Sequence, residues 1–376
     1  MGVSRILHML RKEFRQVLRD PRMRGLIFFA PLVQLALFTF AINTDVRDIT
    51  TAVLDYDHTP ASRALVDSFS ASRHFRITEY AEDDHRAAWL LDRGRVRCLL
   101  NIPPGFAGDM AAGHAPPVQL IVDGTDSNTA ALVLGYATAA ASSYAQGQLA
   151  LSYARAGMPP PPPMVDVRSR AWFNPNLESR IYFIPGLIAL VLTLITVMLT
   201  ALGIVREKEA GTIEQVMVSP IRPLEYILGK TIPFAIIGFI VITLMLILAR
   251  LLFHLPIRGD LLWFYLGALL YLFSTLSTGL LISTMSATQQ QAMLTAFLYF
   301  LPLILLSGFM FPIANMPVPV QWLTLLNPMR YFLVILRGVL LKGLGFELLW
   351  PQYLGLLVLG LLAMALASSR FQKTFA

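Results

Sequence analysis

Charged side chains are scarce in this sequence. Only 14% of its 376 residues are Asp, Glu, Lys or Arg, whereas 56% are hydrophobic. Soluble globular proteins carry about 25% charged residues, so this shortage excludes an ordinary water-soluble chain. Cysteine is scarcer still, and the single Cys98 allows no disulfide within the chain. The region around it is therefore expected to be stabilised by an ordinary hydrophobic core.

Motifs of enzyme chemistry are also lacking. The sequence has neither Gly-x-Ser-x-Gly nor His-Glu-x-x-His, and its six histidines lack metal-ligand spacing. Asp55–His58 is better explained by a strand followed by a helix cap than by a metal site. Leu228–Thr231 resembles the end of a phosphate-binding loop, but Leu224 stands where that loop needs its first glycine. We therefore expect no catalytic residue, no metal and no cofactor bound by this chain.

Long apolar runs are what the sequence has instead. A helix needs about 17–25 apolar residues to cross a hydrocarbon core of about 30 Å, and unpaired backbone groups are too costly in lipid for anything but a helix. Six runs fit this description: Gly25–Ile42, Ile181–Val205, Thr231–Ala249, Leu261–Ser283, Ala292–Ile313 and Gln352–Ala367. The predicted fold class is an α-helical polytopic membrane protein. One transmembrane helix lies in residues 25–43 and five lie in residues 181–376.

Basic residues predict the orientation of these helices. Residues 1–24 hold seven Lys or Arg against two acids, and Arg370 and Lys373 lie near the C-terminus. Because positive loops stay on the cytoplasmic side, both termini are predicted to be cytoplasmic. No small-x-small cleavage site follows the first run, so it is expected to remain as an anchor. The basic residues form no cluster with interleaved aromatics, so we expect no nucleic-acid partner.

The basic N-terminal segment also shows an amphipathic pattern. Over residues 3–19, apolar side chains such as Leu10 and Phe14 share one face, and basic ones such as Arg11 and Arg15 share the other. This pattern predicts an interfacial helix lying on the cytoplasmic surface of the lipid bilayer. A solvated cytoplasmic helix is the alternative.

Residues 44–180 predict a separate domain between the first two apolar runs. Strand-like runs such as Phe75–Tyr80 alternate with helix-like runs such as Pro60–Ala71 and end in an Ala-rich helix from about Asp126 to Ala156. This alternation is typical of a small α/β or α+β domain. Long segments cross the membrane largely regardless of charge, so an extracytoplasmic, periplasmic domain is expected.

Residues 314–345 are apolar but are interrupted by prolines and by Arg330, Arg337 and Lys342. A charge at the centre of a span costs about 2.5–3.5 kcal/mol on insertion scales. We therefore predict re-entrant or interfacial helices on the outer side of the membrane. A seventh span, which would move the C-terminus outside, is the alternative.

A charged segment, Val205–Lys230, separates the second and third apolar runs. Its Arg206–Glu209 portion extends the second run, and Glu209–Ser219 has the spacing of a short amphipathic helix that ends before Pro220. A simple solvated loop is the alternative explanation.

This segment resembles the cytoplasmic loop of ABC-2 type transporter permeases, where an Arg-Glu-x-Glu-x-Gly-Thr-x-Glu run precedes a short coupling helix. Three other stretches agree with the family in the same order: Arg11–Arg22, Trp172–Leu187 and Asn327–Gly343. The resemblance covers essentially the whole chain. It is greatest to the bacterial multidrug branch, which works with a periplasmic adaptor protein.

The resemblance implies a permease subunit of an ATP-binding cassette exporter in the bacterial inner membrane. In that family two permease subunits, identical or paralogous, associate with cytoplasmic ABC ATPase subunits that bind ATP and Mg, so this chain is not expected to be an enzyme. The coupling helix, within residues 206–224, would dock on the ATPase. The implied contact residues are Arg206, Glu207, Glu209, Gly211, Thr212 and Glu214, and charge reversal at both Glu207 and Glu209 is expected to leave folding intact while abolishing coupling.

The family's dimer axis, lined by the second and fifth spans, implies a path for efflux of an amphipathic, drug-like substrate. The candidates on this path are Thr193, Thr196, Phe297 and Phe300, each of which also suits a packing role. An ion-coupled secondary transporter and a non-transporting membrane scaffold or sensor remain as alternatives. Secondary transporters commonly carry ionisable residues within their spans, and no carboxylate lies inside the six runs.

Overall fold

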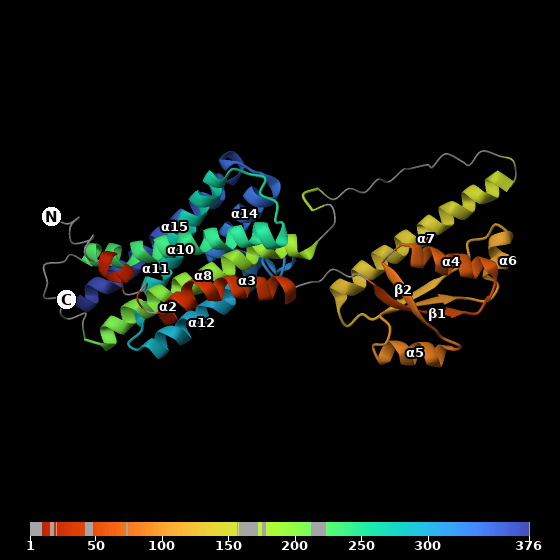
Figure 1. Ribbon diagram of the computed structural model, residues 1–376, viewed down its shortest axis with the longest axis horizontal. Coiled ribbons are helices and arrows are strands. Elements are labelled where there is room, and N and C mark those ends of the chain that lie inside the picture. Colours follow the sequence, from red (N-terminus) through yellow and green to blue (C-terminus); the bar gives the residue numbers. More distant parts are fainter. Residues whose placement is uncertain are drawn as a thin grey trace. The chain divides into compact units, whose positions relative to one another are not determined.

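The computed structural model describes residues 10–15, 19, 21–41, 48–72, 74–155, 157, 172–174, 178–211 and 223–375 (Figure 1). The chain folds as two compact units: Thr44–Ser169, the smaller unit, and Met1–Asn43 with Arg170–Ala376, the helical unit. The boundary at Ser169 differs from the predicted 44–180. The residues that follow it belong with the helical unit, where the Arg258 guanidinium lies 5.6 Å from the centre of the Phe173 ring.

The smaller unit is built on a four-stranded sheet in the order β2-β1-β3-β4. Its strands are β1 (Ile49–Asp55), β2 (Phe75–Tyr80), β3 (Cys98–Ile102) and β4 (Gln119–Val122). The central strand β1 pairs in parallel with β2 and β3, and β4 is antiparallel to β3. Parallel strands need crossover connections, and helices supply them here. Almost every residue of β1 is buried because both faces of the sheet are covered.

Helices form a layer on each face of this sheet (Figure 1). They are α4 (Pro60–Ala71), α5 (Asp84–Asp92), α6 (Phe106–Ala111) and α7 (Ser127–Arg155). Leu65 of α4 and Val133 of α7 share one core with β1 and β3, while Leu90 of α5 belongs to a separate core with Leu54 of β1. The unit contains strands and helices in the alternation that the sequence predicts, because local patterns and turn residues mark each element.

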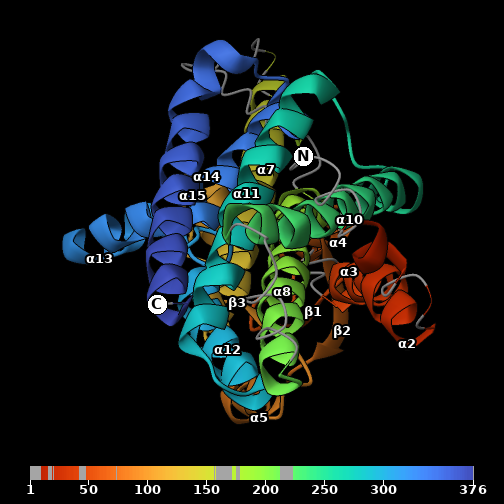
Figure 2. The same cartoon turned by 90° about the vertical axis from the view of Figure 1, so that its left-hand side faces the viewer.

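The helical unit starts with a nearly continuous apolar helix made of α2 (Pro21–Arg24), η1 (Gly25–Phe29) and α3 (Ala30–Ala41). Its long helices are α8 (Ser179–Glu209), α10 (Pro223–Phe253), α11 (Leu261–Met285), α12 (Gln289–Leu305) and α15 (Phe346–Phe375). In Figure 2, α8 lies between α11 and α3, and it contacts α3, α10, α11, α12 and α14 (Pro328–Arg337). Close approach of α8 and α11 requires Gly279, because a Cβ there would lie 2.8 Å from Thr200.

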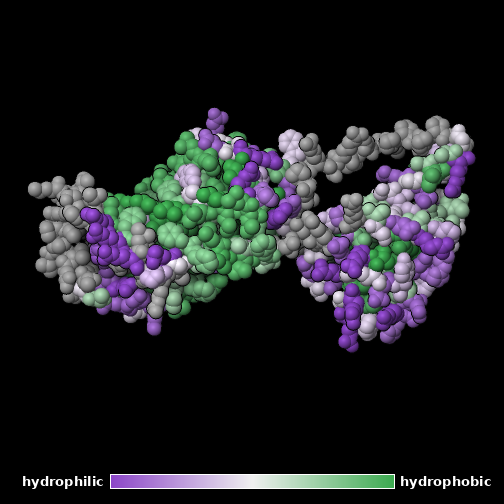
Figure 3. Space-filling view, in the orientation of Figure 1, coloured by the Kyte–Doolittle hydropathy of each residue, from purple (hydrophilic) through white to green (hydrophobic). Residues whose placement is uncertain are grey.

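Among the residues that the structure describes, four helices are long and apolar enough to cross a membrane: α8, α10, α11 and α15. Hydrophobic side chains cover much of the helical unit's surface, whereas the smaller unit is largely hydrophilic (Figure 3). Ile27–Ala41 and Gln289–Leu305 are shorter apolar helices, so six full-length spans are not established. The predicted end of the fifth run at Ile313 is wrong. Its helix ends at Leu305, because Gly308 adopts a φ of +80° and Ser307 accepts the Phe309 N–H.

The predicted re-entrant region contains η2 (Ile313–Asn315), α13 (Val318–Leu323), η3 (Thr324–Leu326), α14 and η4 (Gly338–Lys342). Val318–Leu326 and Pro328–Lys342 meet at 86°, a geometry that suits a broken span or a re-entrant loop. At the bend, the Asn327 side chain accepts from Met329 N and donates to the Leu303 carbonyl of α12 at 2.7 Å. The choice between a span and a re-entrant loop stays a prediction.

Candidate functional site

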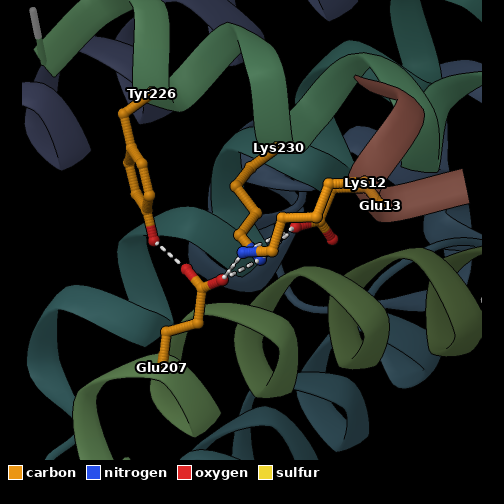
Figure 4. A network of polar contacts seen from close by, with 5 residues as sticks. All are labelled: Lys12, Glu13, Glu207, Tyr226 and Lys230. Carbon is orange, nitrogen blue, oxygen red and sulfur yellow. Dashed lines mark hydrogen bonds and ion pairs between the residues drawn. The ribbon is translucent and has the colours of Figure 1, made fainter. Parts of the chain in front are cut away.

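Five polar side chains meet where three helical segments converge (Figure 4). They are Lys12 and Glu13 of the helical residues 10–15, Glu207 in the last turn of α8, and Tyr226 and Lys230 near the start of α10. Lys230 Nζ lies 2.8 Å from Glu13 Oε1 and 3.0 Å from Glu207 Oε1. Lys12 Nζ donates to the same Glu207 oxygen at 2.9 Å, and the Tyr226 hydroxyl donates to Glu207 Oε2 at 2.7 Å.

Burial makes this ion network depend on its charge balance. Lys230 is 1% exposed and Glu13 is 3% exposed. Removing a charge from water is unfavourable unless partners compensate it. Two carboxylates and two ammonium groups compensate one another here, and the Tyr226 hydroxyl supplies a further donor to Glu207. The network thereby joins residues 10–15, α8 and α10, because separating these side chains would leave buried charges without partners.

The next two residues of α8 fasten its end to other helices. Lys208 Nζ donates to the Ser283 carbonyl near the end of α11 at 2.5 Å. The Glu209 carboxylate accepts from the backbone N–H of Gln289 at 2.7 Å and from the Gln289 side-chain amide. Gln289 is the first residue of α12, where a carboxylate favourably meets unpaired N–H groups. We call Glu207–Glu209, with these partners, the α8 junction.

Immediately after the α8 junction the helix stops. Ala210 is the C-cap, and Gly211 adopts a φ of +67°, the left-handed conformation that favours glycine and commonly ends helices. The N–H of Gly211 donates to the Lys208 carbonyl at 3.1 Å. The predicted contact residues Arg206, Glu209 and Gly211 are exposed.

Thr212 and Glu214, with most of the predicted coupling helix, lie outside the described residues. Glu207 does not present its charge to solvent, where a partner protein could contact it. Its side chain is 13% exposed, and both carboxylate oxygens accept from within the chain.

The predicted substrate-path residues lie in two kinds of surroundings. Thr193 and Thr196 are fully buried between α8 and α11. Thr193 pairs with the Tyr271 hydroxyl, and Thr196 Oγ1 lies 3.0 Å from Thr275 Oγ1. On α12, Phe297 is 56% exposed and Phe300 is half-buried. Their role in a path stays a prediction.

Sequence reasoning missed Glu13, Tyr226 and Lys230. A usable signal existed for Glu13, an acid in a basic segment and at the edge of its apolar face. Lys230 also offered one, because an isolated charge at the start of an apolar helix usually needs a partner. The residues that the structure describes contain no group of three or more His, Cys, Asp or Glu that could hold a metal.

Four membrane-length helices and an apolar surface define a polytopic membrane protein. The family model of the ABC-2 family transporter protein matches residues 22–369, and the chain belongs to this family. It is 31% identical to the probable multidrug ABC transporter permease YbhR of Escherichia coli K12, over 98% of each chain. It is 33% identical to the probable multidrug ABC transporter permease YbhS of that strain, over 88% of this chain and 87% of the relative. It is also 32% identical to the inner membrane transport permease YhhJ of the same strain, over 96% of each chain.

Proposed function

We propose that this chain is the membrane-spanning subunit of an ABC exporter. We further propose that a conformational change of a separate ATPase subunit is transmitted to this chain through the α8 junction. The α8 junction carries the proposal. Three consecutive side chains connect α8 to residues 10–15, α10, α11 and α12. A protein bound to the segment between Gly211 and Pro223 would therefore pull on several helices through one rigid end.

Membership of the family supports the partners and the placement that we propose. ATP would be hydrolysed by a cytoplasmic ABC ATPase subunit, because this sequence lacks a complete phosphate-binding loop. The shorter apolar helices Ile27–Ala41 and Gln289–Leu305 would complete six spans in the inner membrane, with both termini cytoplasmic and the smaller unit periplasmic. A second permease subunit would pair with this one, and a periplasmic adaptor would extend the path. The relatives named as multidrug permeases support an amphipathic, drug-like substrate.

The α8 junction changes which residues are proposed to contact the ATPase. The proposed contacts with the ATPase, as the family implies them, are the exposed Arg206, Glu209 and Gly211, together with Thr212 and Glu214. Glu207 is proposed to act within the chain, because its carboxylate compensates Lys230. It would transmit movement between α8 and α10 rather than bind the ATPase directly.

The test is co-purification of the tagged permease with an ABC ATPase subunit, followed by measurement of ATP hydrolysis. Arg206→Glu should lower the amount of ATPase retained and its activity, with the permease still folded. Arg155→Glu, at an exposed position in the smaller unit, is the matched control and should change neither. Full retention and coupled transport in Arg206→Glu would remove this residue from the interface. Purification of the permease alone, without ATPase activity, would count against the exporter.

An ion-coupled transporter is the second candidate, and one observation favours it. Lys230 lies buried between Glu13 and Glu207, and buried ionisable groups in membrane proteins commonly serve as proton or ion relays. Transport into vesicles separates the two candidates. The exporter requires ATP and the partner subunit and tolerates an ionophore, whereas an ion-coupled transporter loses transport when the ionophore collapses the gradient.

A further inference from the structure

Arg337, at the last turn of α14, is a half-buried cation with no ion-pair partner in the described part of the chain. Its Nε and Nη2 atoms are inaccessible to solvent and have no hydrogen-bond partner there. Nη1 makes one long contact, at 3.4 Å, with the Gly308 carbonyl. The guanidinium carbon lies 3.9 Å from the centre of the Tyr182 ring. A group with five N–H donors is thus left with one weak acceptor and an aromatic face.

Three of the carboxylates described in the helical unit are engaged elsewhere. Glu207 follows Tyr182 by 25 residues along α8, which corresponds to about 38 Å of helix. Near the start of α8, Glu178 pairs with Arg180 at 2.6 Å, and Asp260 caps the N–H of Leu262 at 2.8 Å. The buried N–H groups of Arg337, at Nε and Nη2, cost free energy when they have no acceptor. A ligand that supplies a negatively charged acceptor would remove that cost.

The side chains around Arg337 indicate the chemistry of the rest of that ligand. Tyr182 and Phe183 have ring centres 5.3 Å apart, and Phe183 meets Phe309 edge-on at 5.8 Å. Phe309 packs against α8 so closely that a Cβ at Gly186 would lie 2.0 Å from its ring. The following residues, Met310 and Phe311, are each 54% exposed. Aromatic and apolar side chains around one cation suit an anionic head group carried on an apolar tail.

We propose that Arg337 binds the phosphate or carboxylate head group of an anionic amphiphile, with Tyr182 stacked on the guanidinium. The amphiphile is either exported cargo or a membrane lipid, which share this chemistry. The cargo assignment rests on the proposed exporter function, whereas binding by Arg337 does not. Loss of a hydrogen bond to a charged group weakens binding by about ten- to hundredfold, so the site should be detectable by substitution.

Binding is tested first on the purified permease alone, without its ATPase. Decyl phosphate should raise the thermal unfolding temperature of the wild type, and decyl maltoside should raise it much less, since ligands that bind the folded state stabilise it. Arg337→Gln should need about ten- to hundredfold more decyl phosphate for the same shift. Arg337→Lys, which keeps the charge but not the planar fork, should fall between them. Equal responses of wild type and Arg337→Gln would overturn the proposal.

Arg330→Gln is the matched control on the same helix, because Arg330 already donates to Thr324 and contacts the Gln321 carbonyl. It should respond to decyl phosphate as the wild type does. An equal loss in Arg330→Gln and Arg337→Gln would show a diffuse surface effect and overturn the assignment to Arg337.

The source of the ligand is decided with the permease–ATPase complex in phosphatidylcholine vesicles. Stimulation of ATP hydrolysis by decyl phosphate, lost in Arg337→Gln, supports binding of cargo. Stimulation by phosphatidylglycerol in the bilayer, lost in the same variant, supports binding of lipid. Loss of neither response in Arg337→Gln overturns the proposal. Absence of ATP hydrolysis in the wild type counts against the exporter function and leaves the thermal measurement of binding standing.

Discussion

Two cations of the helical unit, the buried Lys230 and the half-buried Arg337, have opposite surroundings. Lys230 has carboxylate oxygens at 2.8 and 3.0 Å, whereas Arg337 has a carbonyl at 3.4 Å and an aromatic ring. A charge that is compensated inside the chain stabilises the fold, because its partners hold three helical segments together. A charge without compensation adds no such connection and is favoured only when something else supplies its partner. Comparing the two therefore separates a structural ion network from a binding site.

The largest expected effect is at Lys230. Lys230→Met would leave Glu13 and Glu207 buried beside each other, with only the exposed Lys12 nearby. Breaking a buried pair by removing one partner costs about 3–5 kcal/mol, so the variant should show a much lower unfolding temperature or fail to accumulate. Thermal unfolding in detergent measures this, with Lys12→Ala as the control, expected to lose about 0–1 kcal/mol. A Lys230→Met permease as stable as the wild type would show that the network is not structural.

Glu207 should show the next largest effect. Glu207→Gln keeps a polar side chain but removes the charge that Lys230 and Lys12 share, with an expected loss of about 1.5–3 kcal/mol. Glu207→Arg would place a third cation there, so the structure predicts a folding defect where the sequence predicts intact folding. Glu209→Gln, at an exposed site, is the control and should be milder. Unfolding temperatures of the three variants decide this, and equal values for the two Gln variants would contradict it.

Arg337 should respond in the opposite direction. In detergent free of anionic amphiphiles, Arg337→Met removes a half-buried charge that has no ion-pair partner among the described residues, so stability should be unchanged or higher by about 1 kcal/mol. The measurement is the same thermal unfolding used for Lys230→Met. A large loss in both Met variants would mean that Arg337 is compensated within the permease, and the contrast between the two cations would disappear.

The effect that is smallest at neutral pH concerns Cys98, a buried group that stays uncharged. Burial raises the pKa of the Cys98 thiol to about 12, against about 8.5 in an unfolded chain. Between those values the unfolded state binds fewer protons than the folded one, so Cys98 contributes stability below pH 8.5 that is lost as pH rises through this window. The expected slope is about 1.4 kcal/mol per pH unit. Urea unfolding of the permease between pH 8 and 10, with Cys98→Ala as the reference, measures it, and parallel pH profiles would contradict it.

Most of the smaller unit could be predicted from sequence because its signals are local. The helix Pro60–Ala71 has the predicted bounds, and its Thr59 cap accepts from Ser62 N. The strand Phe75–Tyr80 also has the predicted bounds. Alternating side chains and caps act over a few residues, so a single sequence contains them. The end of α12 was harder to predict, since only the left-handed backbone at Gly308 separates it from the apolar residues that follow.

The ion network could be predicted only in part because its members are distant in sequence. Glu13 and Lys230 are 217 residues apart. Resemblance to a family identified Glu207 and Glu209 but not which of them faces inward. The hydroxyls of Thr193 and Thr196 were equally ambiguous, since an apolar helix tolerates threonine for packing or for binding. Only the fold shows that both meet partners on α11.

The 31 residues of α8 correspond to about 46 Å of continuous helix. Tyr182, beside Arg337, lies in its first turn, and Glu207 lies in its last. Two ligands that act on opposite ends of one stiff element are linked thermodynamically, and such linkage is reciprocal. An amphiphile that changed the affinity of the permease for its ATPase would have its own affinity changed by the same factor when the ATPase binds. A titration with either ligand, in the presence and absence of the other, would then measure the coupling free energy between the two ends of α8.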